Sequence, residues 1–168
     1  MNYFELYGIA PSFTIDAAAV RKKFYELSRT HHPDFNGGGT ATEQQEVLEK
    51  SAMINEAYKT LLNKDLLIKY ILTSKGLLQE EEKYNLPPDF LMEVMDLNEQ
   101  VMELDKTDTN AVSSLMATAK NLETELYEAI EPVMGNYSEN TATEKELLQV
   151  KDYYFKKKYL DRIISGLQ

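Results

Sequence analysis

The 168-residue sequence contains no cysteine, and its only two histidines are adjacent, at positions 31 and 32. Without cysteine, the chain can form neither a disulfide framework nor a zinc site with thiolate ligands. Two neighbouring histidines do not supply the spaced set of four ligands that a structural zinc site requires. We therefore expect no disulfide, no metal site and no cofactor.

Long apolar runs are also absent, since no stretch approaches the roughly 20 residues that a helix needs to cross a bilayer. The N-terminal segment MNYFELYGIAP is acidic and aromatic, and it lacks the basic, apolar and small-residue regions of a secretory signal. The formal net charge is −10, whereas a general nucleic-acid binder needs a basic surface. The sequence thus predicts a cytoplasmic protein that binds neither membranes nor nucleic acid.

Charge is distributed unevenly along this acidic chain. The segment 80–105 holds nine acidic residues and a single basic one, Lys83. Basic residues dominate instead between Asp16 and His31 and again between Lys151 and Arg162. A basic patch within an acidic chain is either a solvated helix face or a surface that attracts an acidic partner.

Apolar residues recur at three- and four-residue spacing almost everywhere, and no segment alternates in the manner of a strand. This pattern predicts an all-α fold. Capping residues, glycines and prolines divide the chain into helices at about residues 3–7, 16–31, 40–62, 65–75, 89–104, 110–133 and 143–167.

A charged stretch at 79–83, followed by Pro87 and Pro88, marks a boundary between two domains. We predict an N-terminal domain at 1–76, a linker at 77–88 and a C-terminal domain at 89–168. The first is expected to be an antiparallel helical hairpin with short flanking helices, because a short loop joins its two long helices. The second is expected to be a three-helix bundle.

The stretch RTHHPDFNGGG, residues 29–39, ends the helix at 16–31. Pro33 has no amide hydrogen and pushes His32 out of the helical conformation, so the helix must stop there. His32 and Asp34 could serve as a catalytic base and its orienting acid, but the chain offers no nucleophile motif, no phosphate-binding glycine loop and no second clustered base. A plain helix stop, with Asp34 organising the turn, is the structural alternative.

The helix that precedes this loop has two different faces. Its buried stripe is predicted to comprise Ala17, Val20, Phe24, Leu27 and His31. The opposite face carries Lys22, Tyr25 and Arg29, and we expect His32, beyond the helix end, to be exposed. A helix stop alone does not explain a basic face on the helix that leads into it.

A basic helix that ends in His-Pro-Asp, followed by a loop and by a helix with the residues INEAYKTL (54–61), resembles the J-domain. J-domains bind DnaK-type chaperones and stimulate their ATP hydrolysis through His-Pro-Asp. The resemblance implies a protein that is not itself an enzyme. It also implies that a chaperone contacts a set of loop and helix residues: His32, Pro33, Asp34, Arg21, Lys22, Tyr25 and Arg29.

The rest of the chain is similar to the HscB branch of J-proteins, whose members deliver the iron–sulfur scaffold protein IscU to the specialised chaperone HscA. Gly/Phe-rich and zinc-finger regions are absent, and four segments carry the likeness: 3–8, 15–16, 69–72 and 90–93. Two positions depart from the usual pattern. Phe35 stands where a basic residue usually follows His-Pro-Asp closely, and Leu67 stands where an arginine is usual.

The helix at 89–104 has more apolar surface than a small bundle needs. A first stripe suffices for a core and contains Phe90, Val94, Leu97, Val101 and Leu104. A second stripe contains Leu91, Met95 and Met102, with Met92 beyond it. This helix is either sandwiched between two neighbours, or it carries an acid-rimmed methionine patch that binds another protein.

The HscB resemblance favours the binding patch. It implies that the scaffold protein is held by Leu91, Met92, Met95, Asp96, Glu99, Glu103 and Tyr159. The sequence therefore predicts a co-chaperone that recruits an HscA/DnaK-type chaperone, stimulates its ATPase and presents an IscU-like scaffold protein to it. Two other functions stay open: a J-protein for a different client, and a helical adaptor that has lost ATPase stimulation.

Overall fold

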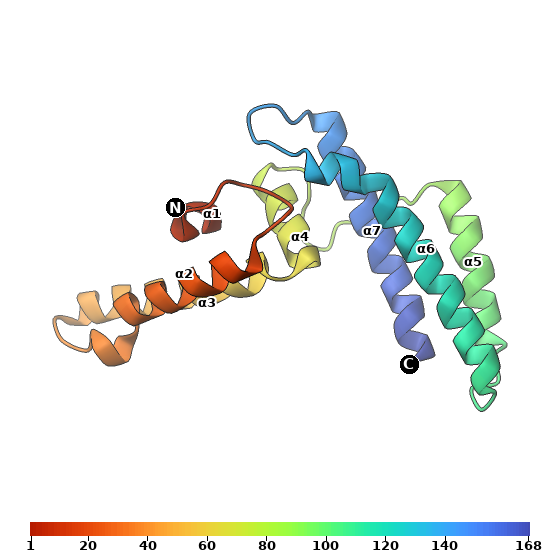
Figure 1. The fold of residues 1–168 in the computed structure, drawn as a ribbon, viewed down its shortest axis with the longest axis horizontal. Helices are drawn as coiled ribbons and strands as arrows, with labels where there is room; N and C mark the ends of the chain where they lie inside the picture. Colours follow the sequence, from red (N-terminus) through yellow and green to blue (C-terminus); the bar gives the residue numbers. More distant parts are fainter. The chain divides into compact units, whose positions relative to one another are not determined.

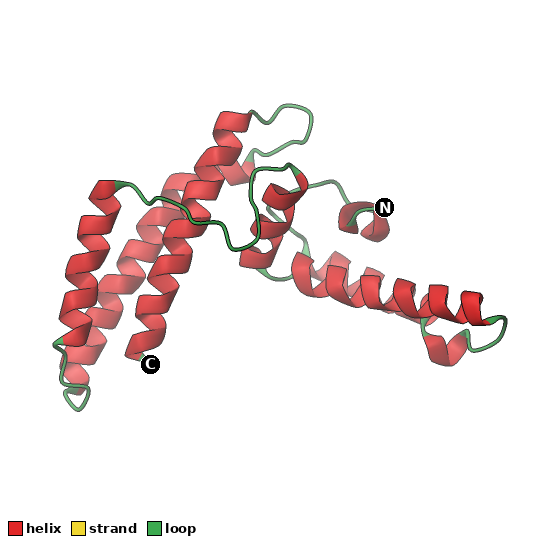
Figure 2. Ribbon diagram, turned by 180° about the vertical axis from the view of Figure 1, so that it is seen from behind, coloured by secondary structure: helices red, strands yellow, loops and turns green.

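The computed structural model describes all 168 residues, and every regular element in it is a helix, as Figure 1 and Figure 2 show. The elements are α1 (Tyr3–Tyr7), α2 (Ala17–His31), the short 3-10 helix η1 (Pro33–Phe35), α3 (Ala41–Leu61), α4 (Lys64–Ser74), α5 (Pro88–Met102), α6 (Thr109–Gly135) and α7 (Glu144–Leu167). The predicted all-α class is confirmed. The chain divides into one unit of residues 1–71 with 137–141, and a second of residues 72–136 with 142–168.

In the first unit, α2 and α3 run side by side in opposite directions (Figure 1). Helix α2 begins where predicted, because the Asp16 carboxylate accepts hydrogen bonds from the backbone N–H groups of Ala18 and Ala19. The start of α3 is capped by the Thr40 hydroxyl, which accepts from the Glu43 N–H at 3.1 Å. Local side-chain chemistry therefore fixes both helix starts.

The hairpin is held by a narrow apolar seam. Val20 is buried on α2, and the facing residues Ile54, Ala57 and Leu61 are buried on α3. Elsewhere, the predicted stripe of α2 is only half-buried, and this includes His31, which we had expected in the core. The reason is geometric, because a two-helix hairpin covers each helix from one side only.

Aromatic side chains tie the short helices to this hairpin. The Tyr7 hydroxyl on α1 donates a 2.8 Å hydrogen bond to the buried carbonyl of Ile54 on α3. Burial raises the pKa of Tyr7 to about 12, so the hydroxyl keeps the proton that it donates. Tyr3 stacks on Tyr70 of α4 with ring centroids 4.4 Å apart, and the Tyr70 hydroxyl accepts from the Tyr3 N–H at 3.0 Å.

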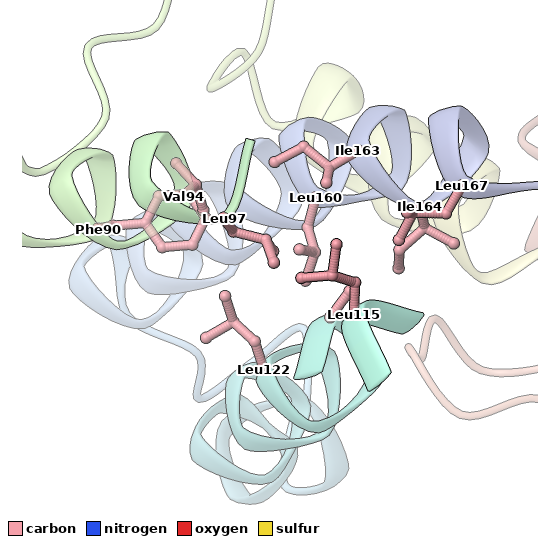
Figure 3. Close-up of a cluster of buried hydrophobic side chains, with 10 residues drawn as sticks. Phe90, Val94, Leu97, Leu115, Leu122, Leu160, Ile163, Ile164 and Leu167 are labelled. Carbon is pink, nitrogen blue, oxygen red and sulfur yellow. The ribbon is translucent and has the colours of Figure 1, made fainter. Parts of the chain in front are cut away.

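The second unit is a three-helix bundle of α5, α6 and α7, whose core is drawn in Figure 3. Helix α5 contributes the predicted stripe, of which Phe90, Val94 and Leu97 are buried. The other two helices complete the core with Leu115, Ala119, Leu122, Leu160, Ile163, Ile164 and Leu167. Burial of each such large apolar side chain stabilises the fold by about 1.5–3 kcal/mol.

Helix ends in this bundle lie within two residues of their predicted positions. Helix α5 begins at Pro88 rather than Asp89, because the fixed φ angle of proline suits the first position of a helix. It ends at Met102 rather than Leu104. Helix α6 continues to Gly135, two residues past the predicted end, with Pro132 inside its last turns.

The segment predicted as a linker, residues 77–88, packs against α7. Leu78 is buried, and the ring of Tyr84 stacks on Phe155 with centroids 4.5 Å apart and planes 9° apart. The Tyr84 hydroxyl donates a 2.8 Å hydrogen bond to Asp152. Burial, followed by the nearby Asp152 carboxylate, raises the pKa of Tyr84 to about 12. These contacts fix the segment to the bundle just before α5 begins.

An ion pair adds to this attachment. The Glu82 carboxylate lies 2.6 Å from the Lys151 ammonium on α7, and the two side chains are 22% and 15% exposed. The hydrogen bond from Lys151 lowers the pKa of Glu82 below its ordinary value of 4.5. Because the folded pKa is depressed, the pair stabilises the fold above the ordinary glutamate pKa, and this contribution is lost as the pH falls through the folded value.

We therefore expect Glu82→Gln to lower the free energy of unfolding at pH 7 by at most about 1 kcal/mol, because solvent still reaches the pair. The difference from the wild type should shrink as the pH falls below 4.5. Denaturant unfolding over a pH series measures it, with Glu93→Gln as the matched control because Glu93 forms no ion pair. A difference between Glu82→Gln and the wild type that stays constant down to low pH would contradict the assignment.

Candidate functional site

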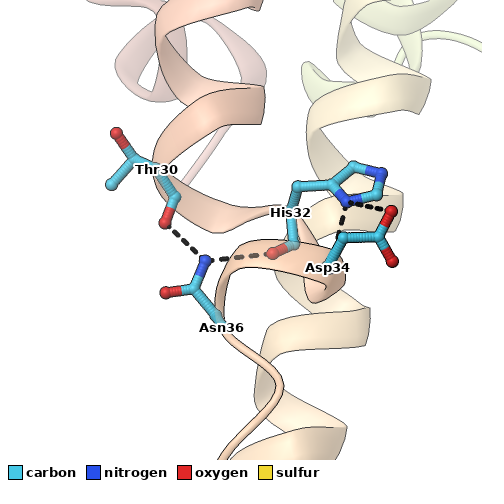
Figure 4. A network of polar contacts seen from close by, with 4 residues as sticks. All are labelled: Thr30, His32, Asp34 and Asn36. Carbon is cyan, nitrogen blue, oxygen red and sulfur yellow. Dashed lines mark hydrogen bonds and ion pairs between the residues drawn. The ribbon is translucent and has the colours of Figure 1, made fainter.

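The His-Pro-Asp loop closes α2 as the single turn η1 (Figure 4). His32 has φ −68° and ψ 137°, an extended conformation that Pro33 imposes on the residue before it. Its Nδ1 accepts the backbone N–H of Asp34 at 3.1 Å. The neutral ring must then carry its proton on Nε2, which leaves Nε2 free to donate to another molecule.

The Asp34 carboxylate lies beside the same ring, with Oδ2 3.6 Å from Nδ1 of His32. The two groups form an ion pair only when the ring is protonated. The side chains of His32 and Asp34 are 45% and 84% exposed, but His32 as a whole residue is half-buried, so the expectation of an exposed His32 is met only for its side chain. A base and an orienting acid normally act on a nucleophile within reach, and the loop brings no such group to them.

Asn36 holds this loop in shape and is not among the residues that we predicted. Its side-chain Nδ2 donates to the carbonyl of Thr30 at 2.8 Å and to that of His32 at 3.0 Å (Figure 4). These are carbonyls at the end of α2, where helical partners run out. The available signal was an asparagine shortly after a helix stop, a residue type that commonly bonds nearby backbone.

The basic face of α2, which comprises Arg21, Lys22, Tyr25 and Arg29, is exposed as predicted. Lys23 pairs with Glu26 at 3.9 Å, whereas the three cations of the basic face form no ion pair within the chain. Lys22, Tyr25 and Arg29 are three and four residues apart and so share one side of the helix. This side presents unneutralised positive charge and an aromatic ring to solvent.

The two departures from the J-domain pattern lie in different surroundings. Phe35 is 73% exposed, and its ring meets His32 edge-on with centroids 5.9 Å apart. An exposed aromatic ring therefore stands beside the loop histidine in place of a cation. Leu67 is only 2% exposed, so it belongs to the packed interior of the chain.

On the second unit, α5 carries a shallow groove that we call the methionine surface. It is lined by Met92, Met95, Asp96, Asn98, Glu99, Met102 and Glu103. The three methionines are 73%, 61% and 78% exposed, in chain order. A helix sandwiched between two neighbours would bury them, so this alternative is wrong for the methionines. They lie opposite the stripe with which α5 enters the core.

The methionine surface contains five of the seven residues that the resemblance assigned to scaffold binding. The other two, Leu91 and Tyr159, do not line the groove. Leu91 is half-buried, and Tyr159 packs from α7 against the bundle core. The structure adds Asn98 and Met102, of which only Met102 was part of the predicted second stripe.

No helix is long and apolar enough to span a membrane. No group of three or more histidine, aspartate or glutamate side chains is arranged so that it could hold a metal ion.

The Asn36 contacts lead to a test of the loop. We expect Asn36→Ala to destabilise the fold by about 0.5–1.5 kcal/mol through lost hydrogen bonds, and to speed amide exchange at Asp34 and Phe35. Asn36→Asp should act more strongly, because a carboxylate cannot donate to the two carbonyls. Asn55→Ala, at an exposed site on α3, is the control. Unchanged exchange in both Asn36 variants would show that Asn36 does not hold the loop.

Two known domain families together match most of the chain. Residues 2–70 match the model of the DnaJ domain, and residues 86–168 match the model described as the HSCB C-terminal oligomerisation domain. The co-chaperone protein HscB homolog of Vibrio vulnificus (strain YJ016) is 38% identical over 107 residues, which cover 62% of this chain and 61% of that protein. The homolog of Shewanella pealeana (strain ATCC 700345 / ANG-SQ1) is 31% identical over 153 residues, 90% of this chain and 80% of that one.

Two solved structures share the fold. The chaperone HscB from Vibrio cholerae has a TM-score of 0.76 at 23% identity, over 99% of this chain and 95% of that one. The human co-chaperone protein HscB has a TM-score of 0.82 at 25% identity, over 99% of this chain and 80% of that one. Both parts of the sequence, the J-domain and the HscB-type bundle, are thus matched in order, and the resemblance is confirmed. The chain belongs to the HscB family of co-chaperone proteins.

Proposed function

We propose that this protein binds an HscA/DnaK-type chaperone through its J-domain, stimulates the ATPase of that chaperone, and delivers an IscU-like iron–sulfur scaffold protein held on its C-terminal bundle. The observation that carries the proposal is the loop at the end of α2. There a His-Pro-Asp turn, whose His32 and Asp34 side chains reach solvent and which is organised by internal hydrogen bonds, adjoins a helix face with three unpaired cations. We also propose that the functional division of the chain falls within residues 77–88.

On the chaperone side, attraction and docking have different sources. Lys22 and Arg29 leave positive charge unneutralised, so they attract an acidic surface over a distance and raise the association rate. At contact, the free Nε2–H of His32 can donate to an acceptor on the partner. ATP is hydrolysed in the active site of the chaperone, and this protein acts on it by binding.

On the client side, the methionine surface supplies the contact. Met92 and Met95 offer exposed apolar area on flexible side chains, which can adapt to a partner's shape. Asp96, Glu99 and Glu103 line the same groove, so their charges can set the orientation of a basic partner. The same adaptability supports a second candidate function, in which the protein delivers a different client.

The first test concerns the loop. We expect His32→Gln to leave the fold intact, because the side chain is 45% exposed, and to abolish stimulation of the chaperone's ATPase. Single-turnover ATP hydrolysis by an HscA/DnaK-type chaperone, with and without the scaffold protein, measures the effect. His31→Gln is the matched control, since it changes the neighbouring histidine outside the tripeptide. Wild-type stimulation by His32→Gln would refute the proposed J-domain activity.

The second test concerns the methionine surface. Replacing Met92 and Met95 with alanine should change the free energy of unfolding by less than about 1 kcal/mol, because both side chains are exposed. Affinity for the scaffold protein should fall at least about tenfold, because apolar anchors dominate interface energy. The control is Val94→Ala. Val94 stands between the two methionines in the sequence but is buried in the core, so its truncation should destabilise the bundle by about 2 kcal/mol.

Thermal unfolding and a binding titration against the scaffold protein separate these effects. A large loss of stability in the methionine variant would show that the two side chains support the core. Normal scaffold binding by a stable methionine variant would remove this surface from the proposed client site. Stimulation of the chaperone in the absence of scaffold protein should survive in this variant, because the proposed chaperone contacts lie in the other unit.

A further inference from the structure

All the sulfur in this chain is methionine sulfur, and three of the four strongly exposed methionines lie on one surface. The sequence has seven methionines and no cysteine. The strongly exposed ones are Met1, Met92, Met95 and Met102, and the last three all belong to the methionine surface. Met134 is 6% exposed within the second unit, and Met53 and Met116 are half-buried.

We propose that the methionine surface is an oxidation site, at which a hydroperoxide converts Met92, Met95 and Met102 to methionine sulfoxides and so weakens client binding. In each step the thioether sulfur attacks one oxygen of the peroxide, an S–O bond forms, and the O–O bond breaks. Sulfur loses two electrons to the peroxide, one peroxide oxygen stays on sulfur, and the other leaves as water when hydrogen peroxide is the oxidant. The effect on binding rests on the proposed client role of this surface.

Exposure makes the reaction selective. A peroxide must reach the sulfur from solvent, and the three side chains are 61–78% exposed on an outward helix face. Met134 lies within the packed interior and is shielded. Because no thiol is present, no cysteine of this chain competes for the oxidant.

The oxidised groups fit poorly into an apolar contact. A sulfoxide oxygen accepts hydrogen bonds, and a complex that buries it without a donor loses affinity. The groove's charged neighbours are Asp96, Glu99 and Glu103, whose ionised carboxylates cannot donate. The Asn98 amide is the one nearby donor in the groove, and it lies 3.9 Å from the sulfur of Met102. Carboxylates outnumber donors in the groove around Met92 and Met95, so a sulfoxide oxygen there finds few donors on its own helix.

Oxidation of these methionines does not change the side chains that form the bundle core. Helix α5 enters the bundle through Phe90, Val94 and Leu97, none of which contains sulfur. Oxidation of the outward face leaves these buried contacts in place. It therefore changes what the helix binds, while the stability of the bundle is preserved.

The experiment treats the full chain with hydrogen peroxide and follows each methionine by peptide mass spectrometry. Met92, Met95 and Met102 should gain oxygen faster than Met116 and Met134. The affinity for the IscU-like scaffold protein, measured by titration, should fall about tenfold or more as the three are oxidised. Methionine sulfoxide reductases should restore the affinity. The melting temperature should stay unchanged.

A matched variant isolates these three sulfurs. The triple variant M92L/M95L/M102L keeps apolar side chains of similar volume but cannot be oxidised at these positions. Its affinity for the scaffold protein is measured before and after treatment, and peroxide should not alter it, whatever the starting value. An equal loss of affinity in the wild type and the triple variant would place the damage elsewhere and overturn the inference.

Two further outcomes separate this inference from the proposed function. If the untreated wild type does not bind the scaffold protein, the client role fails, and the proposed effect of oxidation fails with it. If the untreated protein binds and the oxidised protein binds equally well, the client role stands and only the oxidation switch is refuted. Slower oxidation of these three methionines than of Met134 would also refute it.

Discussion

The one-sided burial of helices in small units governs which surfaces of this protein stay open to solvent. In a two-helix hairpin or a three-helix bundle, each helix has neighbours on one side and solvent on the other. Helix α2 turns Val20 toward α3, and helix α5 turns Val94 toward the bundle core. The opposite faces are thereby left open, and they carry the unpaired cations of α2 and the methionines of α5. Each surface is the exposed complement of a packed stripe, so under the proposed function stability and binding depend on different residues of the same helix.

Features that depend on neighbours along the chain could be predicted from the sequence. The cap at Asp16 and the stop at Pro33 are local, since they concern hydrogen bonds and dihedral angles within a few residues. Features that depend on distant contacts could not be predicted. The stacking of Tyr84 on Phe155 joins residues far apart in the sequence and shows no periodic signal. Likewise, periodicity placed Tyr159 on the last helix, but only tertiary packing shows that it leans on the bundle core and lies outside the methionine surface.

The loop after α2 shows how a short tripeptide acquires a defined shape. Pro33 ends the helix, and the Asn36 amide donates to the carbonyls of Thr30 and His32 at that end. The Asp34 N–H then occupies Nδ1 of His32, which assigns the proton to Nε2. Each of these contacts restricts the conformation of the loop before a partner binds. Binding therefore costs less conformational entropy than it would for an unrestrained loop. A histidine in an unconstrained loop would present either nitrogen in many directions.

Under the proposed function, Phe35 changes the physical character of recognition at this loop. A cation after His-Pro-Asp would attract an acidic partner through a field that salt screens over roughly 8–10 Å. The exposed ring of Phe35 contributes only after contact, through burial of apolar area, and salt does not screen that contribution. Under the proposed function, Lys22 and Arg29 therefore govern the approach of the chaperone, whereas Phe35 and His32 govern how long the encounter lasts. This division places the salt-sensitive step on the helix face and the salt-insensitive step at the loop.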